Sequence, residues 1–136
     1  MLNKYFKLHH FGLALKNFDI SKKFYRSLGY KISKEYLDRA QGVKIILCTS
    51  KNKPTIELIS SLKNSSPIKS YLKKFDEVIY HTCYEFNNKK ALFILKKNFN
   101  AKCILSPRPA KIFKNKKISF YYIKNLGLIE LLDNAK

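Results

Sequence analysis

The chain has 136 residues, of which 46% are hydrophobic and 14% aromatic. This length suits one domain over residues 1–136, and the apolar content excludes an intrinsically disordered chain. The apolar runs fall short of the roughly 18 residues that a membrane-spanning helix needs, and the N-terminal segment lacks the unbroken apolar core of a signal peptide. We therefore expect a globular protein with no membrane partner.

The charge is strongly positive, with 28 Lys and Arg against 9 Asp and Glu and a net charge of +19. Such a field attracts nucleic acid, anionic lipid or phosphate-bearing small molecules. The lysines are scattered, however, only three of the basic residues are arginines, and no helix-turn-helix or RNP signature is present. The charge is thus typical of a solvated lysine surface, and we do not expect a nucleic-acid partner.

The chain has three cysteines, Cys48, Cys83 and Cys103, without a C-x-x-C spacing. An odd number without paired spacing predicts reduced thiols in a cytoplasmic protein, not a disulfide frame or a zinc knuckle. Cys83 would share a strand face with His81, but a small buried thiol is more often packing than a ligand.

The first half of the chain predicts one strand, one helix and three further strands. Residues 7–15 alternate as a strand, with His10 and Gly12 on one face. Asp19 is expected to cap the helix that follows, and Gly29 is expected to end it. Strand-like runs then occupy residues 30–37, 43–49 and 55–60.

The second half repeats this order after a linker. Ser66 and Pro67 are expected to open a short linker helix over residues 66–75. A strand at 79–86 leads to a helix capped by Asn87 or Asn88. Further strands are expected near residues 101–105, 117–123 and 127–132, with a turn or loop at residues 106–109. Each half therefore forms a β-α-β-β-β module, at about residues 7–60 and 79–133.

A histidine and a glutamate recur at similar spacing in the two halves. His10 and His81 lie 71 residues apart, and Glu57 and Glu130 lie 73 residues apart. Each histidine is near the start of its module's first strand, and each glutamate is within its last. Two coincidences at nearly one period indicate an internal duplication.

The chemistry depends on where the two glutamates point. A strand glutamate between apolar neighbours ordinarily faces solvent, and this is the simpler reading of Glu57 or Glu130 alone. A buried carboxylate, in contrast, must be paired, protonated or bound to a metal. If a pseudo-twofold axis relates the halves, two imidazoles and two carboxylates converge, which favours a divalent first-row metal.

Several segments together resemble the vicinal oxygen chelate superfamily, which includes glyoxalase I, methylmalonyl-CoA epimerase, bleomycin-resistance proteins and extradiol dioxygenases. The resemblance extends over about residues 7–133. It is carried by residues 10–15 (HFGLAL), 56–59 (IELI), 66–68 (SPI), 81–85 (HTCYE) and 127–132 (GLIELL).

The resemblance implies an α+β fold in which paired βαβββ modules form a cupped, barrel-like mixed sheet around a metal site. The implied ligands are His10, Glu57, His81 and Glu130, around one divalent ion (Zn, Ni, Co or Mn). His10 is preferred over its neighbour His9, which would face the opposite side of a strand.

The implied activity is that of a metal-dependent isomerase or lyase, of the epimerase or glyoxalase I type. The ion would act as a Lewis acid on a carbonyl, and Glu130, or alternatively Glu57, would remove the adjacent proton. The substrate would be a small molecule, a CoA or glutathione thioester or hemithioacetal, and the protein a homodimer. The subfamily stays open, because the first strand lacks the arginine of many glyoxalases and residues 42–47 lack the acid of some epimerases. A non-catalytic small-molecule binding or resistance protein is the alternative.

Overall fold

The computed structural model describes residues 2–62 and 66–134. The chain divides into two compact units: a first unit, His10–Tyr80, and a second unit that combines Met1–His9 with His81–Lys136. These boundaries lie close to those of the two predicted modules. That the two units together make one domain stays a prediction.

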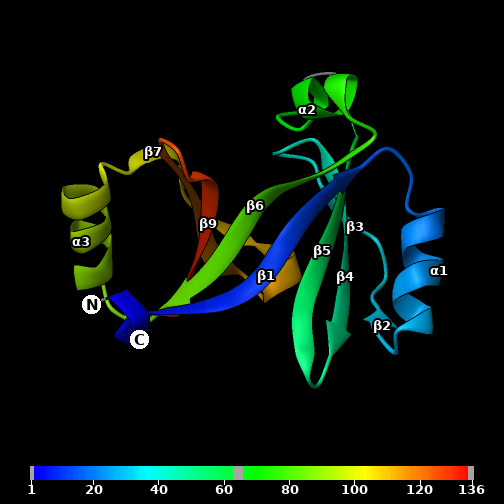
Figure 1. Cartoon of the computed structure of the whole chain (residues 1–136), viewed down its shortest axis with the longest axis horizontal. Coiled ribbons are helices and arrows are strands. Elements are labelled where there is room, and N and C mark those ends of the chain that lie inside the picture. Colours follow the sequence, from blue (N-terminus) through cyan, green and yellow to red (C-terminus); the bar gives the residue numbers. More distant parts are fainter. Residues whose placement is uncertain (1, 63–65, 135–136) are drawn as a thin grey trace. The chain divides into compact units, whose positions relative to one another are not determined.

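The first unit is a mixed sheet with one helix against it (Figure 1). Its strands follow the order β2-β4-β5-β1, and β3 pairs with β4. β1 and β5 are parallel, whereas β4 is antiparallel to β2, β3 and β5. The elements are β1 (Phe6–Leu15), α1 (Asp19–Ser27), β2 (Lys31–Ile32), β3 (Tyr36–Asp38), β4 (Val43–Ser50), β5 (Lys53–Ser61) and α2 (Lys69–Lys74).

The second unit has the same plan, with strand order β6-β9-β8-β7. β6 and β9 are parallel, and the other neighbours are antiparallel. The elements are β6 (Glu77–Phe86), α3 (Lys90–Phe99), β7 (Lys102–Ala110), β8 (Lys116–Ile123) and β9 (Gly127–Asp133), with short 3-10 turns at Leu2–Lys4 and Lys111–Phe113. The expected α+β class with paired βαβββ modules is therefore confirmed.

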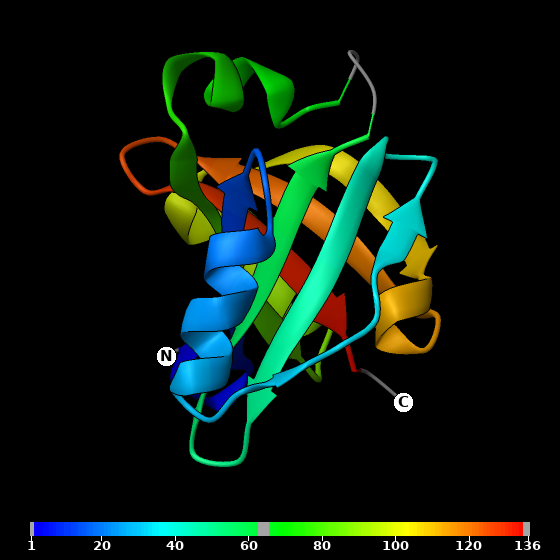
Figure 2. The same cartoon turned by 90° about the vertical axis from the view of Figure 1, so that its right-hand side faces the viewer.

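The core of the first unit lies between one sheet face and α1. Leu58 of β5 is fully buried and Ile46 of β4 is 2% exposed. Tyr25 of α1 packs against this cluster, and Figure 2 shows α1 lying in front of the strands. Because residues alternate along a strand, Leu58 and Glu57 point to opposite faces. The apolar face holds the helix, so the other face is left for the polar side chains.

The second unit builds its core in the same way. Leu131 of β9 is fully buried and packs in one cluster with Ile129 and with Leu95 of α3. Leu131 directly follows Glu130, as Leu58 directly follows Glu57. The duplication thus extends to the core, and burial of each leucine anchors the strand that carries a glutamate, at about 1.5–3 kcal/mol per side chain.

The helix starts differ from the predicted ones by one or two residues. Asp19 is the first residue of α1 and not its cap; its N–H donates to Oδ1 of Asn17 at 2.8 Å. Likewise α3 is preceded by Lys89, although Oδ1 of Asn88 accepts the N–H of Lys90 at 2.9 Å. In both cases an asparagine two residues upstream supplies the acceptor that the helix start needs.

Two further local predictions were wrong. Residues 106–109 are not a loop but lie within β7, at the edge of its sheet. The prolines fit there because an edge strand has one side that needs no hydrogen-bond donor, and the register shifts between Leu105 and Arg108. The linker helix also begins later than predicted, at Lys69, with Pro67 outside it.

The run at residues 30–37 was predicted as one strand but is split into β2 and β3, both paired with β4. Gly29 does end α1 as expected, with a φ of +84° that a side chain would disfavour. The longest helix within residues 2–62 and 66–134, α3, has 10 residues, about half of what a bilayer-spanning helix needs, so none there could cross a membrane.

Candidate metal centre

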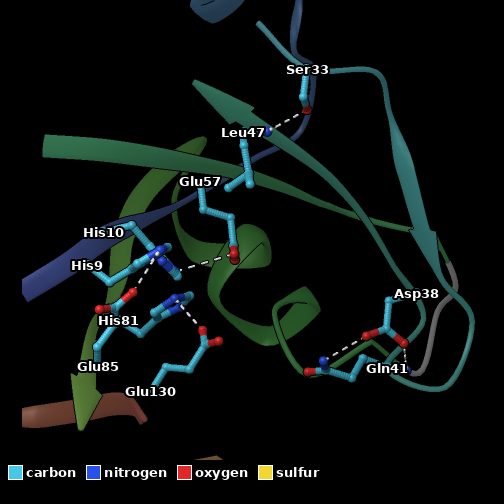
Figure 3. Close-up of polar contacts among 10 residues, drawn as sticks. All are labelled: His9, His10, Ser33, Asp38, Gln41, Leu47, Glu57, His81, Glu85 and Glu130. Carbon is cyan, nitrogen blue, oxygen red and sulfur yellow. Dashed lines mark hydrogen bonds and ion pairs between the residues drawn. The ribbon is translucent and has the colours of Figure 1, made fainter. Parts of the chain in front are cut away.

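A histidine and a glutamate meet on the first unit's sheet face opposite α1. β1 and β5 run parallel with Gly12 opposite Glu57 and His10 opposite Thr55. His10 lies two residues from Gly12, so its side chain points to the same face as that of Glu57. Nε2 of His10 lies 3.3 Å from Oε2 of Glu57, and the two side chains are 0% and 4% exposed (Figure 3).

The second unit carries an equivalent pair. β6 and β9 run parallel with Cys83 opposite Glu130, and His81 lies two residues before Cys83. Nε2 of His81 lies 2.9 Å from Oε2 of Glu130, with side-chain exposures of 0% and 4% (Figure 3). The ring of Phe120, which is opposite Glu130 in β8, packs edge-on against His81 at a centroid distance of 5.4 Å.

The two pairs occupy the same position in their sheets. In each unit the glutamate is opposite the residue two places after the histidine, Gly12 in one and Cys83 in the other. The antiparallel neighbour of each glutamate is apolar, Leu47 on β4 and Phe120 on β8. The repeat seen in the sequence is therefore a structural repeat.

The burial of the carboxylates excludes the solvent-facing reading of the two glutamates. Glu57 and Glu130 are each 3% exposed. Removing a carboxylate from water costs several kcal/mol unless a hydrogen-bond donor or a cation compensates it, and in each unit an imidazole nitrogen stands beside it. A buried Glu next to a strand histidine is costly for packing alone, so its occurrence in both units indicates a function.

The donor set within each pair fits a divalent metal. An imidazole nitrogen and a carboxylate oxygen are ligands that Zn, Ni, Co and Mn all accept. Both side chains come from paired strands, which hold ligand atoms more firmly than loops do. In each unit the apolar residues on the other face of the sheet are buried in the core. Their burial sets the face to which His10, Glu57, His81 and Glu130 point.

His9 lies outside these pairs. Its side chain is 24% exposed, its Nε2 lies 3.7 Å from Oε1 of Glu85, and its ring packs edge-on against Phe113 at 5.3 Å. His9 is not in the predicted ligand set because a strand turns it to the side opposite His10. Glu85 was not singled out from the sequence, because nothing in its spacing marks it as a partner of His9.

Two buried residues of the second unit lie on opposite faces of its sheet. Tyr121 is 3% exposed and belongs to the apolar core. Cys83 is fully buried and lies opposite Glu130, on the face that carries His81, so its role as packing stays a prediction. In the first unit, Cys48 is also buried, and burial raises the pKa of its thiol to about 11. Neither the tyrosine nor Cys48 faces the histidine–glutamate side of its sheet.

Comparisons with known proteins agree with the fold. The chain resembles the crystal structure of methylmalonyl-CoA epimerase from Mycobacterium tuberculosis, with a TM-score of 0.79 and 24% identity over 95% of this chain and 88% of that one. It also resembles a Streptomyces coelicolor methylmalonyl-CoA epimerase in complex with 2-nitronate-propionyl-CoA, with a TM-score of 0.80 and 19% identity over 97% and 99% of the two chains.

A hypothetical protein from Bacillus halodurans is similar as well, with a TM-score of 0.79 and 24% identity over 96% of both chains. At these identities the likeness shows the fold. The comparison with curated protein sequences gave no significant match. The family model described as "Glyoxalase/Bleomycin resistance protein/Dioxygenase superfamily" matches residues 9–122, a span that includes His10, Glu57 and His81. The chain therefore belongs to the glyoxalase/bleomycin resistance protein/dioxygenase superfamily, which is the vicinal oxygen chelate superfamily.

Proposed function

We propose that the pairs His10–Glu57 and His81–Glu130 together hold one divalent metal ion, and that the protein is a metal-dependent isomerase or lyase that removes a proton next to a carbonyl group. The observation that carries this proposal is the burial of both pairs, each 0% and 4% exposed, at equivalent register in the two units. The pairs are not needed for stability, since two apolar side chains of similar volume would stabilise the fold as well or better.

When bound, the ion would supply Lewis-acid stabilisation of negative charge on a carbonyl oxygen. The chain's own residues do the rest. His10 and His81, held on β1 and β6, would each offer an imidazole nitrogen to the ion, and the carboxylates of Glu57 and Glu130 would balance its charge. The apolar residues opposite the carboxylates, Leu47 and Phe120, limit the access of water.

Glu130 is the proposed base, and Glu57 is the second candidate. The ring of Phe120 lies opposite Glu130 and against His81, so the Glu130 carboxylate has an apolar neighbour on one side and an imidazole at 2.9 Å on the other. A carboxylate held in this way can take a proton from the substrate carbon and return it to the same or the neighbouring carbon. The first outcome is epimerisation and the second is isomerisation.

The substrate classes to test are two. The similar structures from Mycobacterium and Streptomyces are methylmalonyl-CoA epimerases, which supports an acyl-CoA thioester. The ligand set of two histidines and two glutamates resembles that of glyoxalase I, which supports the hemithioacetal of glutathione and methylglyoxal. In both reactions the same proton abstraction occurs. We further propose a cytoplasmic homodimer.

The test is solvent-deuterium exchange into methylmalonyl-CoA and into the hemithioacetal, together with elemental analysis of the purified protein. We expect exchange into one substrate, and an activity about 10²- to 10⁴-fold lower in Glu130→Gln. The matched control is Glu85→Gln, the same change on the β6 residue that pairs with His9, and it should retain exchange. Metal without exchange into either substrate would favour a non-catalytic binding protein.

A further inference from the structure

The second unit contains a cavity of about 310 Å³ on the sheet face that turns away from its histidine–glutamate pair. Ile129 and Leu131 line this cavity and flank Glu130 on β9, so alternation along the strand points them to the other face. Tyr84 of β6, three residues after His81, lines the cavity as well. The cavity is therefore separate from the proposed metal site, and its role is independent of the proposed function.

The lining of this cavity is almost wholly apolar. α3 supplies Leu95 and Phe99, and the N-terminal segment supplies Leu2 and Phe6. Water finds few hydrogen-bond partners against such a lining, and apolar cavities of this kind stay dry and take up apolar molecules. The volume is at the lower end of the range for small-molecule sites. The lining therefore favours a small ligand with a hydrocarbon part.

The rim of the cavity is exposed to solvent, whereas its floor is buried. Phe99 at the end of α3 is 46% exposed, and Leu126 in the turn between β8 and β9 is exposed as well. Leu95 and Leu131 are buried. A hydrocarbon chain that enters past Phe99 and Leu126 would remove its own surface and that of both side chains from water, which is favourable for each methylene buried.

A second, polar cavity of about 190 Å³ adjoins the apolar one. Asn3 and Phe6 line both cavities, so the two meet at the N-terminal segment. Lys4 and Lys7 line the polar cavity. Nζ of Lys4 lies 5.1 Å from the centre of the ring of Tyr5, which belongs to the same lining, so this contact holds the ammonium group beside the cavity.

One acid of the polar lining must be counted. Glu85 lines this cavity, and its Oε1 lies 3.7 Å from Nε2 of His9. Lys4 and Lys7 carry two positive charges against the one negative charge of Glu85, so within the described part of the chain the lining keeps a net positive charge. A single carboxylate suits this charge, whereas the roughly two charges of a phosphate group would exceed it.

We propose that the two adjoining cavities bind a medium-chain fatty acid, with its hydrocarbon chain in the apolar cavity and its carboxylate beside Lys4 and Lys7 in the polar one. A carboxylate accepts charge-assisted hydrogen bonds from ammonium groups, and these are stronger than hydrogen bonds between neutral groups. A neutral hydrocarbon would make no use of the lysines, and a short anion would make no use of the apolar lining.

Titration calorimetry with three probes separates the two parts of the ligand. Decanoate carries the chain and the charge, its methyl ester carries the chain alone, and acetate carries the charge alone. The apolar cavity is tested by Phe99→Gln, which places an amide at the rim. Its matched control is Phe93→Gln, the same change at an exposed residue of α3 outside both linings.

The polar cavity is tested by the double substitution Lys4→Gln with Lys7→Gln. Its matched control is Lys116→Gln with Lys117→Gln, which removes the same charge from β8 outside both linings. Thermal melting followed by circular dichroism checks that all four variants fold, and the probes are kept below the concentrations at which decanoate forms micelles.

We expect Phe99→Gln to weaken the binding of decanoate and of its methyl ester alike, by about fivefold or more, because both chains lose the same apolar contact. The Lys4 and Lys7 double variant should weaken decanoate binding by about threefold or more and leave the methyl ester unchanged. Each control should change decanoate binding by less than about twofold, and acetate should bind far more weakly than decanoate.

The proposal is overturned if the wild-type protein binds no decanoate, or if Phe93→Gln loses as much affinity as Phe99→Gln. It is also overturned if decanoate and its methyl ester bind equally well and the lysine substitutions leave both unchanged, since the ligand would then be a neutral apolar molecule. Acetate bound as tightly as decanoate would likewise overturn it, because the apolar cavity would then contribute nothing.

Discussion

Leu131→Ala tests whether the leucine beside each glutamate anchors the strand that presents it. Leu131 is fully buried, with 0% of its surface exposed. It packs in the apolar core of the second unit with Ile129 and Leu95. The substitution removes about three carbon groups, or about 2.4 kcal/mol of transfer free energy, to which the cavity adds roughly 1 kcal/mol. We expect the free energy of unfolding to fall by about 3–4 kcal/mol.

The same change in the first unit provides an internal repeat of the experiment. Leu58 is also 0% exposed and directly follows Glu57, so Leu58→Ala should cost a similar amount. Leu126→Ala is the matched control, because Leu126 is 67% exposed, and it should cost less than about 0.5 kcal/mol.

The assay is urea unfolding at equilibrium, supported by thermal melting. A loss of 3–4 kcal/mol corresponds to a melting temperature about 10 °C lower for a chain of this size. The reasoning is refuted if Leu131→Ala costs less than about 1 kcal/mol, or no more than Leu126→Ala, since β9 would then not depend on that contact.

Three other predictions follow from local features. Burial raises the pKa of the Cys48 thiol to about 11, so at pH 8 a thiol reagent should modify the exposed Cys103 quickly and Cys48 only after unfolding, as mass mapping of the labelled peptides will show. The hydrogen bond and charge of Lys16 lower the pKa of the Asp76 carboxyl. This pair therefore stabilises the fold at pH values above the ordinary carboxyl pKa, and the effect is lost as the pH falls through the lowered pKa. An NMR titration of Asp76 with a midpoint at or above the ordinary value of about 3.9 would contradict this prediction. Gly29→Ala should destabilise the fold by about 1 kcal/mol in urea unfolding, because Gly29 has a φ of +84°, and an unchanged midpoint would show that this turn is not strained.

The sequence was sufficient for the parts of the fold that rest on periodicity. Alternation along residues 7–15 and 79–86 placed His10 and His81 on strands, and the repeated spacing of Glu57 and Glu130 predicted that they are equivalent. The structure confirms this equivalence in the register of β1 with β5 and of β6 with β9. Such features can be predicted because they depend on the local pattern of residues and on the internal duplication, both of which are visible in a single sequence.

The parts that the sequence could not predict depend on contacts between distant segments. The two prolines within residues 106–109 are ordinarily a turn signal, and only the edge position of β7 makes them compatible with a strand. Lys16, Lys69 and Lys73 line one cavity, which is formed by residues after β1, at the end of β5 and on α2. Among 28 basic residues, nothing in the spacing of Lys16, Lys69 and Lys73 marks them as neighbours.

The most direct test of the central claim is the number of metal ions that the protein binds, measured by titration calorimetry and elemental analysis of wild type, Glu57→Gln and Glu130→Gln. If the two histidine–glutamate pairs hold a common ion, the wild-type protein binds one divalent ion per chain, and either substitution weakens that single site by tenfold or more. Two independent ions per chain, or one ion whose affinity is unchanged by one of the substitutions, would contradict the account.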